Sequence, residues 1–196
     1  MKSFFVSLLS AVFAFSATAS AQEQIEMIDA RDLQTVLTIQ ANIQAGLDWK
    51  VGDRATYKLD MGGFLKGSSN NYVSQDTGTG FWIVQEIDLM FQKQKVETLI
   101  NKATGQIEKM LVNGQEQSIP KVESEVLEMK EARVTVAAGT FDCIYVKIRD
   151  KSDGKISEAW INPQVVPMSG TLKAVADSPL GKVVQEVTSM QFAPRN

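Results

Sequence analysis

Hydrophobic and polar residues alternate with two different periods in this chain, and the period changes near Trp49. Before that residue, apolar side chains recur at the spacing of an amphipathic helix, which predicts a helix over residues 29–45. Asp29 or Asp32 can cap its first turn, and Gly46 follows where a left-handed residue often ends a helix. Because such a helix has to bury its apolar side, we expect it to pack against the remainder of the protein.

After Trp49, the chain follows the period of two that is typical of half-buried strands. Residues 54–61 alternate strictly, and turn sequences such as Gly62-Gly63 and Asn113-Gly114 divide the chain into short strands. The charged residues 121–130 fit either a helix or a solvated strand. Further strands are expected over residues 65–75, 81–91, 95–100, 106–112, 133–138, 140–150, 155–161, 170–176 and 182–192.

Short turns between consecutive strands make those strands antiparallel neighbours. A sheet of about ten strands rarely stays flat and open, so it has to curve or be covered. The fold class that we predict is therefore mainly β (α+β), a curved antiparallel sheet or half-barrel with the N-terminal helix packed against it.

The first 21 residues have the features of a cleavable signal peptide. Lys2 gives a positive start, the apolar run over residues 4–15 is too short to span a bilayer, and Ala19 and Ala21 suit a signal peptidase. We expect cleavage of residues 1–21 and one exported domain over residues 22–196, with no membrane span. Since the residue directly after the cleavage point is Gln22 and not a cysteine, we expect a periplasmic protein that is not lipid-anchored.

The composition argues against several function classes. The chain has no histidine, which removes histidine metal sites and Ser-His-Asp or Cys-His catalysis. Its one cysteine, Cys143, cannot form an internal disulfide, and its apolar neighbours predict a buried, inert thiol. Without Lys2, 19 Lys and Arg stand against 23 Asp and Glu, so nucleic acid is not an expected partner.

Carboxylates give no better case for catalysis. Glu86 and Asp88 share one face of an expected strand, and two acids on the same exposed face usually only solvate it. We therefore predict that the protein is not an enzyme, that it has no catalytic residues, and that it uses no cofactor and no metal ion.

The strand expected over residues 81–91 carries the main candidate site, a face of large apolar side chains broken by Gln85. Such a face is usually core, and in a curved sheet it can also line a cavity for an apolar ligand. Trp160 has an apolar ring and one donor, which suits the edge of the core or the mouth of such a cavity. The candidate ligand-binding residues are Phe81, Ile83, Ile87, Leu89, Phe91 and Trp160.

A motif in the second half of the chain resembles an uncharacterised family of bacterial periplasmic proteins. It consists of Gly139-Thr140-Phe141-Asp142-Cys143 (G-x-F-x-C), then Trp160, then Val166-Pro167-Met168-Ser169-Gly170 (V-P-x-x-G). Residues 49–57 are similar to the start of that family. The family is similar in turn to the LolA, LolB and LppX carriers, and this resemblance implies a curved antiparallel sheet, closed by helices, that holds acyl chains.

Two functional hypotheses follow. In the first, the protein is a non-catalytic soluble periplasmic protein that binds an apolar ligand, a lipid or lipoprotein acyl chain, in the concavity of the sheet. In the second, it is a cell-envelope interaction or scaffold protein with a filled core, and a sheet edge or the helix docks an envelope protein.

Overall fold

The computed structural model describes residues 47–90, 92–119, 124–178 and 181–195. Within these ranges the chain is β throughout, and the helix predicted over residues 29–45 lies outside them. The strands are β1 (Arg54–Met61), β2 (Leu65–Asp76), β3 (Gly80–Leu89), β4 (Gln92–Asn101), β5 (Ile107–Val112), β6 (Gln115–Gln117), β7 (Ser124–Val136), β8 (Gly139–Asp150), β9 (Ile156–Ile161), β10 (Thr171–Ser178) and β11 (Gly181–Gln191).

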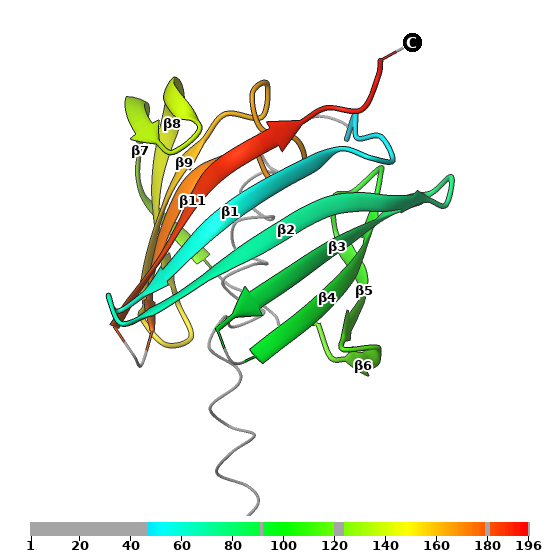
Figure 1. Ribbon diagram of the computed structural model, residues 1–196, viewed down its shortest axis with the longest axis horizontal. Coiled ribbons are helices and arrows are strands. Elements are labelled where there is room, and N and C mark those ends of the chain that lie inside the picture. The colour runs from blue at the N-terminus through cyan, green and yellow to red at the C-terminus, as the bar shows by residue number, and fades with distance from the viewer. Residues whose placement is uncertain (1–46, 91, 120–123, 179–180, 196) are drawn as a thin grey trace, which may run out of the picture.

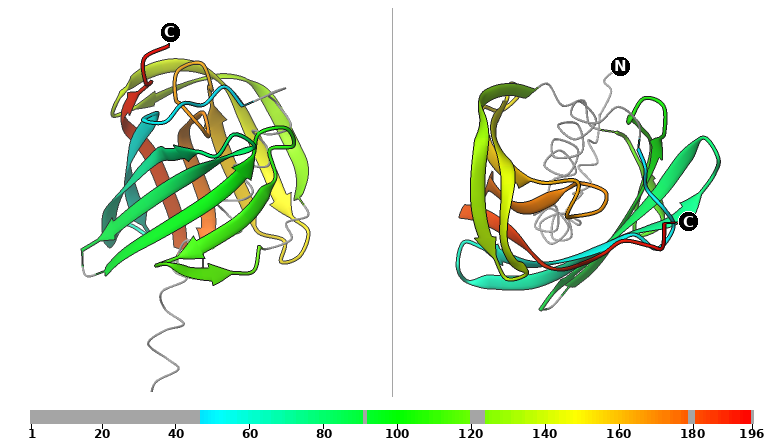
Figure 2. Two further views of the ribbon diagram at one scale, coloured as in Figure 1. Left: turned by 90° about the vertical axis from the view of Figure 1, so that its right-hand side faces the viewer. Right: turned by 90° about the horizontal axis from the view of Figure 1, so that it is seen from above.

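All eleven strands form one antiparallel sheet in the order β6-β5-β4-β3-β2-β1-β11-β10-β9-β8-β7. Every neighbour in this order is also a neighbour along the chain, except that the first strand pairs with the last (Figure 1). The sheet bends into an arch that does not close on itself, so β6 and β7 are its edges (Figure 2). The prediction of a curved antiparallel sheet is therefore confirmed.

A buried carboxylate holds the two ends of the described chain together at the pairing of β1 and β11. Asp53 is fully buried, and its Oδ1 accepts a hydrogen bond of 2.8 Å from the backbone N–H of Ala193. Its Oδ2 accepts from the backbone N–H of Lys50 at 2.9 Å and from Arg195 Nη2 at 3.0 Å. These donors offset the cost of burying the charge and fix where the last strand meets the first.

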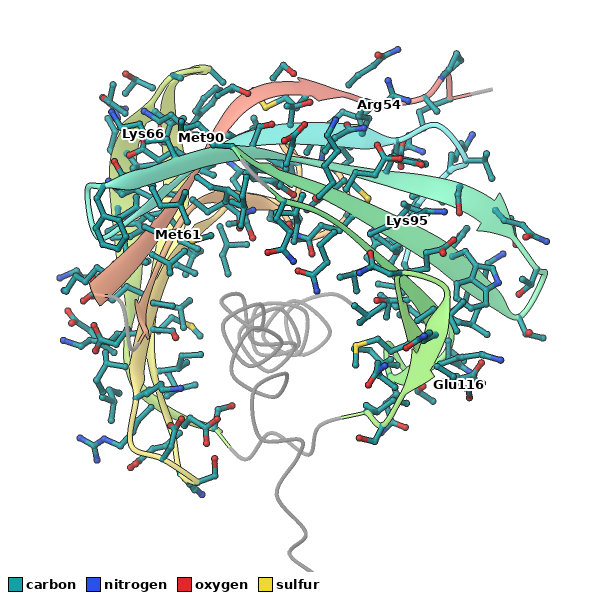
Figure 3. The ribbon with its side chains drawn as sticks, turned by 60° about the horizontal axis from the view of Figure 1, so that its bottom comes forward. Arg54, Met61, Lys66, Met90, Lys95 and Glu116 are labelled. Carbon is teal, nitrogen blue, oxygen red and sulfur yellow. The ribbon has the colours of Figure 1, made fainter. Side chains whose placement is uncertain are left out.

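Successive side chains of each strand point to opposite faces of the sheet. On β1, Met61 lies on the concave side of the arch and Arg54 on the convex side (Figure 3). The cross-strand pairs carry this assignment to β2, β11 and β10, because paired residues share a face.

The main hydrophobic core lies at one end of the concave face and includes Tyr57, Leu172 and Val187. The loop between β9 and β10 contributes Val166 and Met168, and the Tyr57 hydroxyl lies 3.4 Å from Ser169 Oγ in that loop. The tip of the β7–β8 hairpin also reaches this end, where the Ala138 N–H donates to the Val187 carbonyl at 3.3 Å. The loop and the hairpin thus cover the core at one end of the arch.

Gly170 shows why the V-P-x-x-G motif ends in glycine. Its φ is +66°, and a Cβ at this position would lie 2.9 Å from the backbone N and Cα of Pro163. Both the left-handed backbone and the close approach exclude a side chain there. The motif therefore fixes the loop that covers the core.

The sequence left one segment open, and several strand bounds differ from those predicted; β4 begins at Gln92, and β6 was not predicted as a strand. Residues 124–130, which fitted a helix or a strand, belong to β7, and this strand continues through residues 133–136. The strand expected over residues 81–91 ends at Leu89 as β3, and Phe91 lies outside the described residues.

Candidate functional site

Four of the predicted site residues lie on the concave face of β3. Phe81, Ile83, Ile87 and Leu89 are all buried, with at most 9% of each side chain exposed. The register confirms the face, because Ile87 pairs with Ser69 and Ser69 pairs with Tyr57 of the core. The fifth residue of the predicted face, Phe91, lies outside the described residues.

These four residues divide between two apolar clusters. Phe81 and Ile83 belong to the main core, where the Phe81 ring lies 5.8 Å from that of Trp49. Ile87 and Leu89 belong to a second cluster further along the concave face, together with Leu59, Met61 and Leu65. We call this group the second cluster.

Gly67 makes room for the second cluster. It pairs with Leu59 on one side and with Leu89 on the other. A Cβ at this position would lie 2.7 Å from Leu89 Cδ2 and 2.5 Å from the Asp88 carbonyl oxygen. Any side chain here would therefore displace Leu89 from the concave surface.

A third cluster occupies the concave face of β8 and β9 and consists of Val146, Ile148, Ala159 and Ile161. It does not join the second cluster, because the residues of β10 between them on this face are Ala174 and Ala176. Their side chains are too short to bridge the two groups. The concave side of the described sheet therefore carries separate apolar clusters of buried residues beside one end-capped core.

A polar network interrupts the apolar surface of β2 and β3. Gln85 is 3% exposed, and its Nε2 donates a hydrogen bond of 3.2 Å to Ser69 Oγ. The Ser69 hydroxyl donates in turn to Asn71 Oδ1 at 2.6 Å. Gln85 Oε1 has no donor among the described residues. The sequence showed that Gln85 breaks the apolar pattern, and only the fold reveals the unpaired oxygen.

The sixth candidate, Trp160, lies in the convex row of β9, and its half-buried side chain packs against the main core that contains Phe81 and Ile83. It pairs with Tyr145 on one side and with Lys173 on the other. Its ring centroid lies 5.1 Å from that of Tyr145, and Lys173 Nζ lies 5.7 Å from it. This position at the margin of the main core fits the first of the two interpretations of Trp160, the edge of the core.

The convex row of residues continues through ion pairs. Glu186 accepts from Lys58 Nζ at 2.6 Å and from Lys173 Nζ at 2.9 Å. The hydrogen bond from Lys58, with that from Lys173, holds the pKa of Glu186 below its usual range despite partial burial. Beyond the aromatic pair, Lys130 Nζ lies 5.2 Å from the Tyr145 ring. On the convex face, the charged side chains and aromatic rings of this row thus contact one another across neighbouring strands.

A pocket of about 560 Å³ lies at the β7–β8–β9 edge of the sheet beside Cys143. Cys143 Sγ donates to the Ala132 carbonyl oxygen at 3.4 Å, and only 7% of the residue is exposed. Burial, with the nearby Asp142 carboxylate, raises the pKa of the thiol. The predicted burial of Cys143 is confirmed, and its surroundings disfavour the reactive thiolate.

Neither carboxylate of the former candidate pair faces the concavity. Glu86 accepts from the Tyr72 hydroxyl at 3.1 Å, and Asp88 pairs with Lys93 at 3.1 Å. Both acids are exposed on the convex face. The described residues contain no group of three or more acidic, cysteine or histidine side chains placed to hold a metal ion. They also contain no helix with the length and hydrophobicity needed to cross a membrane.

No protein-family model matches the chain, and no curated protein matches its sequence. Among solved structures it is similar to a chain of the Pseudomonas aeruginosa MucA/MucB complex, with a TM-score of 0.46, 14% identity and coverage of 86% of this chain. The match spans 58% of the length of that chain.

Two further solved structures are similar at the same level. For the hypothetical protein CT021 from Chlamydia trachomatis, the TM-score is 0.48 and the identity 14%, covering 76% of this chain and 91% of the other. For a putative exported protein with a YmcC-like fold from Bacteroides fragilis, the TM-score is 0.39 and the identity 10%, and the match covers 74% of this chain and 98% of the other. At 10–14% sequence identity, these similarities are similarities of fold alone.

Proposed function

We propose that this protein is a non-catalytic exported protein that binds an apolar ligand, a lipid or an acyl chain, against the concave face of its sheet. The observation that carries the proposal is the division of that face into separate apolar clusters. The second and third clusters belong to a sheet that no second sheet covers in the described part of the chain. A broad apolar surface inside a curved sheet suits an extended hydrocarbon chain.

Two further parts of the proposal rest on the sequence. The absence of histidine and the pairing of Glu86 and Asp88 on the convex face support a binding protein over an enzyme. Export to the periplasm, with removal of residues 1–21 and without a lipid anchor, follows from the signal-peptide pattern. Mass spectrometry of the purified protein should find a chain that starts at Gln22 and carries no acyl group on its N-terminus.

A lysine placed in the second cluster tests the ligand site. Ile87 is a buried residue of the second cluster, outside the capped main core that contains Ile83. We expect Ile87→Lys to fold and to lower the affinity for a fluorescent fatty acid by at least about tenfold, because an ammonium in an apolar site is costly.

The matched control is Ser68→Lys, which adds the same charge to the exposed convex face of the neighbouring strand. It should bind the fatty acid as the wild type does, and circular dichroism should show all three proteins folded. Wild-type protein that shows no saturable binding of the fatty acid would refute the proposed function.

One observation favours the alternative of an envelope interaction protein. The edge strand β7 exposes Val126, Leu127 and Met129, with 54%, 37% and 54% of each residue accessible. A free edge with apolar side chains can accept a strand from another protein. A photo-crosslinking residue at position 129 should then capture a specific envelope protein in cells, whereas the same residue at position 90, exposed in the β3–β4 turn, should not.

A further inference from the structure

The polar network of Ser69, Asn71 and Gln85 lies in the middle of the concave apolar surface. Asn71 and Gln85 are a cross-strand pair, and Gln85 pairs with Val96 on its other side. Along β3, the same face carries Ile83 of the main core and Ile87 of the second cluster. Gln85 therefore marks the boundary at which the capped core ends and the second cluster begins.

The hydrogen bonds of this network determine which atom of the Gln85 amide stays unpaired. Because the Ser69 hydroxyl gives its hydrogen to Asn71 Oδ1, Ser69 Oγ acts as an acceptor toward Gln85. The Gln85 amide consequently presents its Nε2 to Ser69 and turns Oε1 away, toward no donor of the described residues. A buried amide oxygen without a hydrogen bond destabilises a protein, so its presence needs an explanation.

The charges of the neighbouring strands limit what can donate to Gln85 Oε1. Of the residues that β1 to β4 direct to the concave face, only Asp76 is charged; it ends β2 opposite Phe81 and is paired with Lys102. A carboxylate or phosphate held here would have no counterion on these strands, and it would have no hydrogen to donate. A neutral hydroxyl or amide N–H meets both conditions.

We infer that Gln85 Oε1 is a polar anchor in the ligand site and that the ligand is an acyl chain carrying a neutral hydrogen-bond donor, a hydroxyl or an amide N–H. The donor bonds to Gln85 at the edge of the core, and the hydrocarbon lies along Ile87 and Leu89 in the second cluster. This inference rests on the proposed function and narrows its ligand from any apolar chain to one with a buried donor.

Three uncharged probes with the same chain length test the inference by displacement of a fluorescent fatty acid. They are methyl tetradecanoate, which has no donor, methyl 3-hydroxytetradecanoate, which adds a hydroxyl, and N-methyltetradecanamide, which has an N–H. We expect wild-type protein to bind a donor-bearing probe with roughly tenfold higher affinity than the plain ester. Whichever of the hydroxyl and amide probes binds more tightly shows which kind of donor the natural ligand carries.

The variant Gln85→Leu should abolish this preference while it binds the plain ester at least as well as the wild type. The control Thr98→Val removes another buried polar side chain of the concave face, on β4, and should keep the preference for the donor.

The outcomes separate this inference from the proposed function. If the wild type binds all three probes equally, or Gln85→Leu keeps the preference, the anchor is refuted and the apolar site stands. If no probe and no fatty acid binds, the proposed function itself fails.

Discussion

The two faces of this sheet are built from alternate residues of the same strands, yet they hold together by different means. On β10, Leu172 points to the concave face and is fully buried in the main core. Its neighbour Lys173 points to the convex face, where it contacts Glu186 and the Trp160 ring. One face is held by apolar burial and the other by contacts between paired side chains of adjacent strands.

The convex contacts follow the register of the sheet across half of the arch. Lys130, Tyr145, Trp160, Lys173, Glu186 and Lys58 are consecutive cross-strand partners on six strands. Their charges and rings are used within the protein, so this face offers few free groups to a ligand. The concave face has the opposite character, with large apolar clusters and one unpaired amide oxygen. This difference between the faces is the reason that we propose binding on the concave side.

The largest effect should come from truncating the two neighbours on β10. We expect Leu172→Ala to lower the free energy of unfolding by about 2–5 kcal/mol, because it leaves a cavity in the core. Lys173→Ala should cost about 1 kcal/mol, since it removes only a surface ion pair and a cation–ring contact. Urea denaturation of both variants checks this order, and similar losses would contradict the difference between the faces.

Alkaline pH should probe the concave face through Tyr57. Burial raises the pKa of its hydroxyl to about 12, while the unfolded chain releases this proton near the ordinary value of 10.0. The folded state is therefore favoured below the unfolded pKa, and this contribution is lost as pH rises through the folded value. Denaturation at several alkaline pH values should show a smaller loss of stability for Tyr57→Phe than for the wild type. If both proteins lose stability equally with rising pH, the Tyr57 hydroxyl is exposed to solvent instead of buried.

Cys143 should behave as a small apolar group. We expect Cys143→Ser to fold and to lose roughly 0.5–3 kcal/mol of stability, because the hydroxyl replaces a buried thiol without a disulfide partner. The native protein should react slowly with a thiol reagent, and the denatured protein should react at once. Rapid stoichiometric labelling of the native protein would show an exposed, reactive thiol.

The smallest effect should come from the convex row. Near neutral pH, Glu186→Gln should cost at most about 1 kcal/mol, because the two lysines remain near solvent. The pKa of Glu186 is lowered in the folded state, so its stabilising effect is present above the unfolded pKa and disappears as pH falls through the folded value. The stability gap between wild type and variant should close in acid, and a gap that widens would contradict the assignment.

Local sequence patterns were sufficient to predict most of the strands. Residues 54–61 form β1 as their alternation predicted, and Asn113-Gly114 forms the turn between β5 and β6. The pattern failed at residues 124–130, where an edge strand exposes most of its side chains and so carries no clear alternation. Charged edge strands are consequently hard to distinguish from solvated helices.

Features that depend on distant pairing could not be predicted in the same way. The junction of β1 with β11 depends on Asp53 and Arg195, which are far apart in sequence. The face of Trp160 was likewise hidden, because alternation along β9 does not say which side becomes concave. For Gln85, the sequence showed the break in the apolar pattern, and its unpaired oxygen depends on Ser69 and Asn71 of another strand.

The most direct test of binding on the concave face is native mass spectrometry of the full protein purified from the envelope of its own cells. We expect the protein to carry a non-covalent adduct with the mass of a single acyl-chain compound, which is released on denaturation. The adduct should be reduced in Ile87→Lys and retained in Ser68→Lys. Protein that is isolated gently and has only the mass of its own chain would contradict the proposal that the concave face holds an apolar ligand.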